Sequence, residues 1–315
     1  MAIRGKIVVV ALLTFALAAM TPAFAAEKQS LGDAWWTGPL QTPNAGTIPQ
    51  NHIYIETYFA VEQDNGVYNN NGTKIGANKP GGGGYDNDYQ STTLFTYGLT
   101  NKFNFQTLLG MDGAQGGTGV QGSNGAEVGL LRIRLPYKLH SYKQGKWAPT
   151  FSFVPEVNAP VASGSVWQPG IGFWAIRPFW MPNGRILRIR ASEDIWFPKG
   201  GKSVGLGNCA EGATSCSYDA AKYGVTQVGL EYSLTKHWVP AFDFVWKYYG
   251  QNKYNGVAYA VDGVTLKGRR DFRIDPALEY NFTGNTGIIF GAEVTVSGRN
   301  TGSYIAPQIA LQWFK

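Results

Sequence analysis

The sequence is poor in charge, histidine and cysteine, and each shortage narrows the function. Only 15% of its residues are charged, and the 27 basic and 21 acidic residues form no basic cluster. Nucleic acid is therefore not an expected partner, because its phosphates are bound by concentrated positive charge. Three histidines and two cysteines also give no complete metal-ligand set, so no metal or other cofactor is expected.

The chain also lacks an apolar run of the roughly 20 residues that a membrane-spanning helix needs. Its run from Ile7 to Met20 has about 14 residues, follows Arg4 and Lys6, and precedes Ala23-Phe24-Ala25. These features predict a secretory signal peptide over residues 1–25. Removal of Arg4 and Lys6 with it would lower the formal net charge from +6 to +4.

The two cysteines, Cys209 and Cys216, lie close together in a stretch rich in glycine, alanine and serine. In an exported protein, an isolated close pair predicts a disulfide that closes the loop between them. A metal site is the weaker alternative, because two thiolates without a nearby histidine leave the coordination shell incomplete.

Glycine and aromatic residues are abundant, with 41 Gly, 17 Tyr, 17 Phe and 10 Trp. This composition is typical of β structures with many turns. From His52 onward, segments alternate apolar and polar side chains; in one of them Ile274 and Leu278 alternate with Asp275 and Glu279. A period of two indicates strands whose two faces meet different solvents.

Twelve such strands are predicted, and their connections are in most cases alternately short and long. They lie near 51–63, 88–100, 102–112, 125–138, 148–158, 170–181, 185–197, 221–235, 237–250, 270–283, 286–298 and 303–315. A soluble sandwich would share the period but not this alternation, whereas outer-membrane barrels have short periplasmic turns and long outer loops. We therefore expect an all-β, transmembrane, antiparallel up-and-down β-barrel over residues 51–315, with both termini in the periplasm.

Aromatic residues gather at the ends of these strands, as the two interfacial girdles of a barrel require. Trp147, Trp180, Trp238, Tyr280, Phe282 and Trp313 lie near the turns, and Trp167, Trp196 and Tyr248 lie near the long loops. The alternative is that they form the core of a soluble domain. The barrel predicts outer-membrane lipid and the barrel-assembly machinery as partners, and nothing indicates an oligomeric state.

Three stretches carry a resemblance to a known family. They are Tyr97 to Phe103 at the first tight turn, Leu230 to Trp238 at a later one, and the terminal Ala310 to Phe314. In their order and spacing the chain resembles the outer-membrane transporters of the MetA-pathway of phenol degradation, which are similar in kind to long-chain fatty-acid barrels. That family usually ends on an aromatic residue, whereas Lys315 follows Phe314 here. The resemblance implies a transport role and supplies no binding residues.

Alternation places charges of both signs toward the lumen. The candidates are Glu56, Glu62, Arg132, Arg134, Glu156, Arg177, Arg188, Arg190, Asp194, Glu231, Asp243, Lys247, Arg273, Asp275, Glu279 and Glu293. One interpretation is a set of ion pairs that brace the cylinder, because unpaired charge in a narrow space is costly. The other is a polar path whose arginines attract anionic solutes. The two interpretations are compatible.

Barrel size limits what could pass, since about twelve strands enclose a narrow or plugged lumen. Residues 26–50, which include Trp35 and Trp36, are predicted to form either a plug or a periplasmic lead-in. Catalysis is not expected: adjacent side chains such as those of His140 and Ser141 point to opposite faces of an extended chain.

The sequence therefore predicts a passive outer-membrane transporter or channel for small solutes, which include hydrophobic or aromatic compounds. The alternative is a closed structural or adhesive barrel that acts through its long outer loops.

Overall fold

The computed structural model describes residues 28–115, 127–161, 166–203, 216–258, 260–261 and 264–315. The predicted signal peptide and Cys209 lie outside the described residues, so both stay predictions. Apart from one 3₁₀ turn, η1 (Leu31–Asp33), the regular elements of the described chain are strands. Among these residues, no helix is both long and apolar enough to cross a membrane.

Twelve antiparallel spans form a closed ring, which confirms the predicted fold class. They are β1 (Ile53–Tyr68), β3 (Asn87–Thr100), β4 (Phe103–Gln115), β5 with β6 (Glu127–Arg134 and Tyr137–His140), β7 (Thr150–Ala159), β8 (Gln168–Trp180), β9 (Ile186–Trp196), β12 (Tyr223–Tyr232), β13 (Trp238–Tyr249), β18 (Arg270–Asn281), β19 (Thr286–Arg299) and β20 (Thr301–Phe314). The ring closes because β1 pairs with both β3 and β20, through Ile53 opposite Tyr97 and Tyr54 opposite Phe314. Closure leaves no unpaired sheet edge.

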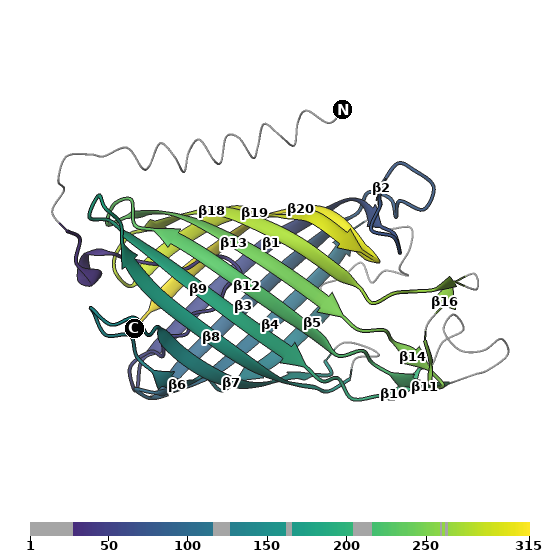
Figure 1. The fold of residues 1–315 in the computed structure, drawn as a ribbon, viewed down its shortest axis with the longest axis horizontal. Helices are drawn as coiled ribbons and strands as arrows, with labels where there is room; N and C mark the ends of the chain where they lie inside the picture. Colours follow the sequence, from purple (N-terminus) through teal and green to yellow (C-terminus); the bar gives the residue numbers. More distant parts are fainter. Residues whose placement is uncertain (1–27, 116–126, 162–165, 204–215, 259, 262–263) are drawn as a thin grey trace.

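The two ends of the cylinder differ, as Figure 1 shows. The C-terminus and the short connections lie at one end, which we call the turn end. The other, the loop end, carries the remaining short strands. These are β2 (Lys74–Gly76), which pairs with β1; the sheet of β10 (Gly201–Ser203), β11 (Cys216–Asp219), β14 (Lys253–Tyr254) and β15 (Val257–Ala258); and the pair β16 (Ala260–Val261) and β17 (Val264–Thr265).

Two strands differ most from their predicted ranges. The strand expected at 125–138 is split at Leu135 and Pro136, because proline has no N–H to donate to the ladder. The first strand continues to Tyr68, where a register shift between Asp64 and Gly66 lets it follow the start of β20. The final hairpin, which joins β19 to β20, turns on one residue, Asn300, which has a φ of 51°.

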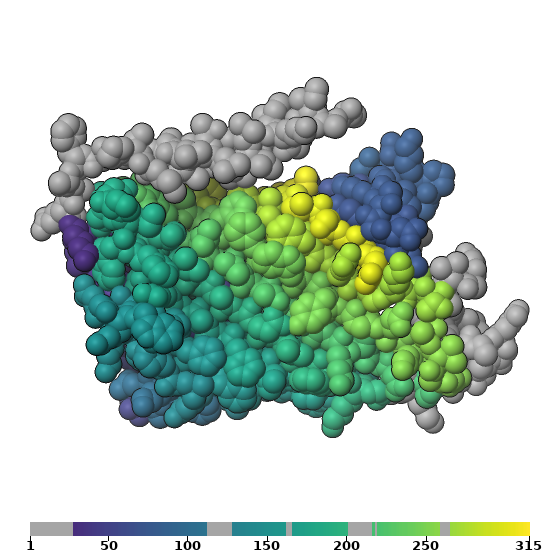
Figure 2. Space-filling model, in the orientation of Figure 1, coloured from purple at the N-terminus to yellow at the C-terminus, as the bar shows by residue number. Residues whose placement is uncertain are grey.

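The wall has an apolar outer face and a polar inner face. On β18, Ile274 and Leu278 point outward, while Asp275 and Glu279 point inward and are fully buried. Phe290, Ile309 and Leu311 are among the exposed apolar side chains on the outside. Figure 2 shows one side of this wall as a surface of packed side chains. Such a surface suits a hydrocarbon surrounding and a wet interior.

Two of the predicted girdle residues do not serve that role. Trp196 is buried and stacks on Tyr223 inside the barrel, and Trp180 donates from Nε1 to the Gln29 carbonyl oxygen over 2.8 Å. Both lie at the predicted strand ends, but their strand parity turns them inward. By contrast, Trp238 and Trp313 are exposed on the outside.

Candidate functional site

All but one of the charged residues predicted for the lumen lie on the inner face of the barrel. Those that line its central cavity are Glu56, Glu62, Arg132, Arg134, Arg188, Arg190, Asp194, Lys247, Arg273 and Glu293. Those that are buried in the wall around it are Glu156, Glu231, Asp243, Asp275 and Glu279.

Arg177 is the exception, and its predicted lumen position is wrong. Its cross-strand partner is Ile189, which in turn pairs with Leu230 on the outer face. The guanidinium lies over the ring of Phe179, with Cζ 4.6 Å from the centroid. On β8 the inward positions belong instead to Gly170, Gly172 and Trp174. Charge was therefore a misleading marker of the inner face on this strand.

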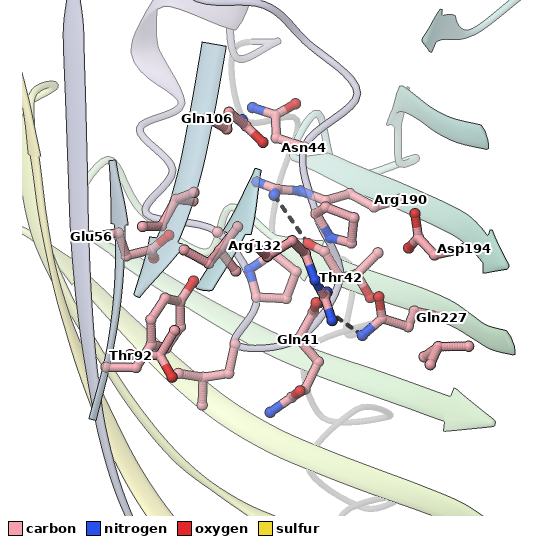
Figure 3. Close-up of a pocket in the computed structure, with 18 of the residues that line it drawn as sticks. Gln41, Thr42, Asn44, Glu56, Thr92, Gln106, Arg132, Arg190, Asp194 and Gln227 are labelled. Carbon is pink, nitrogen blue, oxygen red and sulfur yellow. Dashed lines mark hydrogen bonds between the residues drawn. The ribbon is translucent and has the colours of Figure 1, made fainter. Parts of the chain in front are cut away.

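The central cavity has a volume of about 890 Å³, and its lining extends from Phe314 at the turn end to Arg269 at the loop end. In Figure 3, Glu56 and Thr92 lie on one side of this space, while Arg190 and Asp194 lie on the other. The lining is mainly polar, and its charged groups come from strands on several sides of the ring.

Ion pairs between strands brace the inner wall. Arg134 on β5 approaches Glu156 on β7, with Nε 3.0 Å from Oε2. On β9, Arg188 and Arg190 both bind Glu231 of β12, and the Arg190 Nε lies 2.8 Å from Oε2. One carboxylate thus serves two guanidiniums, a geometry that fixes the register of both strands.

A third ion-pair cluster lies between β18 and β19. Arg273 Nε lies 2.7 Å from the Asp271 carboxylate, and its Nη1 lies 3.3 Å from Glu293. The hydroxyl of Tyr304 donates to Glu293 over 2.8 Å. These contacts tie three consecutive strands together, because Tyr304 belongs to β20.

Residues 28–50, the N-terminal segment, enter the barrel and occupy part of its lumen. The main-chain N–H of Thr37 donates to the Glu279 carboxylate over 2.7 Å. Farther along, the N–H groups of Gln41 and Thr42 donate to the two oxygens of Asp243 over 3.0 and 3.2 Å. Buried carboxylates need such donors, since burial without hydrogen bonds is costly.

Wall residues also bind carbonyl oxygens of the segment, as Figure 3 shows for two of them. Gln227 Nε2 donates to the Gln41 carbonyl over 3.0 Å, and Arg190 donates to that of Thr42 over 3.4 Å. On β7, Ser152 donates to the Ala45 carbonyl over 2.6 Å. The segment is thus hydrogen-bonded to the wall through both its N–H and its C=O groups.

Apolar packing and glycines on the inner face also accommodate the N-terminal segment. Leu40 is buried in a cluster with Ala241, Ile289 and Ala310. A Cβ atom on Gly291 would lie 2.8 Å from Leu40 Cδ1, and one on Gly229 would lie 2.9 Å from Pro39 Cγ. Glycines on the inner face therefore leave the room that the segment occupies, and they are the feature of the sequence that indicates a filled lumen.

Cys216 is buried and disulfide-bonded, but Cys209 lies outside the described residues, so their pairing stays a prediction. In the described part of the chain, no three His, Cys, Asp or Glu residues are grouped as a metal site. The ring nitrogen Nδ1 of His140 lies 2.7 Å from the carbonyl oxygen of Pro149 at the turn end.

The closed ring, apolar exterior and polar lumen define an outer-membrane type of β-barrel. Comparison with solved structures agrees with this class. The chain is similar to the COG4313 outer membrane channel from Pseudomonas putida, with a TM-score of 0.63 and 11% identity over 88% of this chain and 100% of that chain. At this identity the likeness establishes the fold alone.

Two further structures are less similar. The KdgM porin has a TM-score of 0.40 and 11% identity over 82% of this chain and 98% of that chain. The toluene transporter TbuX from Ralstonia pickettii has a TM-score of 0.36 and 11% identity over 94% of this chain and 96% of that chain. No family model and no curated protein matches the chain.

Proposed function

We propose that this protein is a passive outer-membrane channel for small solutes. The observation that carries the proposal is the polar cavity of about 890 Å³, whose lining reaches from one end of the barrel to the other. In this proposal the turn end, which holds the C-terminus, faces the periplasm, and the loop end faces outward, as in other bacterial barrels. Outer-membrane lipid and the barrel-assembly machinery are the partners that this placement requires.

The N-terminal segment is the plug of this channel rather than a periplasmic lead-in. Support comes from its bonds to Glu279, Asp243 and Ser152, which belong to different strands of the ring. A segment held at so many points narrows the path, so passage requires that part of it moves. The bonds are individually modest, because each replaces a bond to water, and local release is therefore feasible.

Small aromatic compounds are the proposed solutes. The resemblance of the Tyr97, Leu230 and Ala310 stretches to phenol-pathway transporters implies this class. The lining combines aromatic residues such as Tyr54, Tyr58 and Trp174 with charged ones. Aromatic walls can contact a planar solute by stacked or edge-to-face packing, while the polar groups keep the path wet.

A closed structural barrel is the second candidate, and the dense ion pairing of the inner wall favours it. Single-channel recording of the mature full-length protein in planar bilayers separates the two. The informative variant combines Asp243→Asn with Glu279→Gln, which replaces one acceptor oxygen of each carboxyl with an NH₂ group and so weakens the hydrogen bonds that hold the segment. Glu193→Gln is the matched control, because Glu193 lies on the outer face and bonds with Thr226 and Tyr248 there.

A channel is expected to show discrete openings that become longer or more frequent in the double variant and are unchanged in the control. Silence in both the mature protein and the double variant would favour the structural barrel.

A further inference from the structure

A row of stacked side chains crosses the inner wall near the loop end. Trp196 stacks on Tyr223 with ring centroids 4.8 Å apart, and Tyr223 stacks on Tyr249 with centroids 5.0 Å apart. An arginine lies over each end: Arg132 Cζ is 4.6 Å from the Trp196 centroid, and Arg269 Cζ is 5.0 Å from that of Tyr249. These five residues, which we call the aromatic row, all line the central cavity.

Strand register builds this row. Trp196, Tyr223 and Tyr249 are direct cross-strand partners on β9, β12 and β13. Arg132 belongs to β5 and reaches Trp196 from the opposite side, past β7 and β8. Gly170 of β8 makes room there, since a Cβ atom at that position would lie 2.6 Å from Trp196 Cδ1.

Hydrogen bonds hold the row in place. Arg132 donates from Nε to Asn158 Oδ1 over 2.6 Å, and Asn158 donates from Nδ2 to the Tyr223 hydroxyl over 3.0 Å. That hydroxyl donates in turn to Gln168 Oε1 over 2.5 Å. Arg132 thus has a fixed orientation, and a guanidinium carries further N–H donors on its two terminal nitrogens.

The row presents positive charge to the cavity. Stacking covers the negative ring faces, so the rings can meet a solute mainly with their edges, which are the positive part of an aromatic quadrupole. The arginines are also more exposed than their acidic neighbours. The Arg132 side chain is 16% exposed and that of Glu156 is 0%, while the Arg269 side chain is 45% exposed and that of Asp271 is 0%.

The row also lies where two cavities meet. A second cavity of about 410 Å³ at the loop end is lined by Gln168, Tyr223, Tyr249 and Arg269, and the central cavity shares these four residues. A solute that moves from the loop end toward the centre of the barrel would therefore contact the row.

We propose that the aromatic row is a recognition site for solutes that carry a carboxylate. Arg132 and Arg269 supply charge-assisted hydrogen bonds to the carboxylate. The positive ring edges between them also attract the carboxylate, and they leave the N–H donors of the arginines free to bind it. The proposal rests on the proposed channel only for the route by which the solute arrives. It deepens that function by naming anionic compounds, such as aromatic acids, as the preferred solutes.

Calorimetric titration of the detergent-solubilised mature protein tests this site without requiring transport. Benzoate is the probe, and benzyl alcohol is its neutral counterpart with the same ring. We expect benzoate to bind about tenfold more tightly than benzyl alcohol, and Arg132→Gln or Arg269→Gln to remove that advantage. Arg270→Gln is the matched control. It removes the same positive charge at the same end of the barrel, but Arg270 is exposed on β18 and does not belong to the row.

Arg132→Lys and Arg269→Lys are controls for misfolding. They keep the positive charge, so we expect them to retain part of the preference for benzoate. Equal binding of the two probes, or full benzoate affinity in the Gln variants, would overturn the proposal. Benzoate binding by a protein that is silent in bilayers would remove the channel and keep the site. Conductance without a preference for benzoate would rule out the binding site and keep the channel.

Discussion

The two halves of the lumen handle buried charge in different ways. In the turn-end half, Asp243 and Glu279 are fully buried, and main-chain N–H groups of the N-terminal segment donate to both carboxylates. In the loop-end half, Arg132 and Arg269 keep part of their surface and face open cavity. The N-terminal segment therefore covers buried carboxylates in one half, and two partly exposed arginines are available to a solute in the other.

The proposed function assigns these two halves separate tasks. In the proposed channel, the filled half sets whether a solute passes, because the N-terminal segment must move first. In the same proposal, the open half selects the solute that is held near the loop end, because its charges can contact a solute while the segment stays in place. Mutations in the two halves should therefore have separable effects, and four predictions test that separation.

The largest expected effect comes from Glu231, whose carboxylate binds both Arg188 and Arg190. Glu231→Ala leaves two guanidiniums without their partner, and breaking a buried pair in this way costs about 3–5 kcal/mol. The midpoint of urea unfolding in detergent, followed by tryptophan fluorescence, should fall accordingly. Glu193→Ala on the outer face serves as the control, and an equal loss in both variants would contradict the special weight given to the inner pair.

Leu40 tests the apolar part of the plug. Leu40→Ala removes a buried side chain at the contact with Ala241, Ile289 and Ala310, a loss that costs about 2–5 kcal/mol in well-packed sites. Because the loss falls on the segment, we expect more frequent channel openings and faster proteolysis of residues 28–50, with an intact barrel. Leu31→Ala, at an exposed position, should change neither; an equal response of the two variants would count against the packing account.

Gly170 tests the open half. Its Cβ position lies 2.6 Å from Trp196 Cδ1, so Gly170→Ala forces that ring to move, at a cost of about 1–3 kcal/mol. Benzoate affinity should fall, while the opening frequency should stay that of the unaltered protein. A change in opening frequency without a change in affinity would show that the two halves are not separable as described.

Arg177 should give the smallest effect. Its guanidinium lies over Phe179 on the outer face, away from both halves of the lumen. Arg177→Gln is expected to change unfolding stability by less than about 0.5 kcal/mol and to leave conductance and benzoate binding unchanged. If Arg177→Gln shifted the charge selectivity of the channel, Arg177 would have to face the lumen, which would contradict its outward placement.

The fold was predictable because the outer face of a barrel wall meets lipid and the inner face meets water. Apolar and polar residues therefore alternate along each strand. Residues such as Ile274 and Asp275 show this alternation without help from distant parts of the chain. The interruption at Pro136 could have been anticipated from its missing N–H. The inward turn of Trp196 and the outward turn of Arg177 could not be judged by residue type, because parity overrides polarity at both positions.

The plug was less predictable, because its contacts join residues far apart in the sequence. Thr42 and Asp243 are separated by 201 positions, and nothing local to either one indicates the other. The available signal was a set of glycines at inward positions of the wall, including Gly229 and Gly291. A polar inner face with gaps in its side-chain cover indicates that another part of the chain fills them.

The most direct test of the account locks the N-terminal segment to the wall. A Cβ atom on Gly287 would lie 3.3 Å from the Cβ of Thr37, which is close to the separation that a disulfide bridges. In the double variant Thr37→Cys with Gly287→Cys, single-channel recording should show openings under reducing conditions and none once the cross-link has formed. The same conductance with and without a cross-link verified by mass spectrometry would contradict the claim that this segment closes the channel.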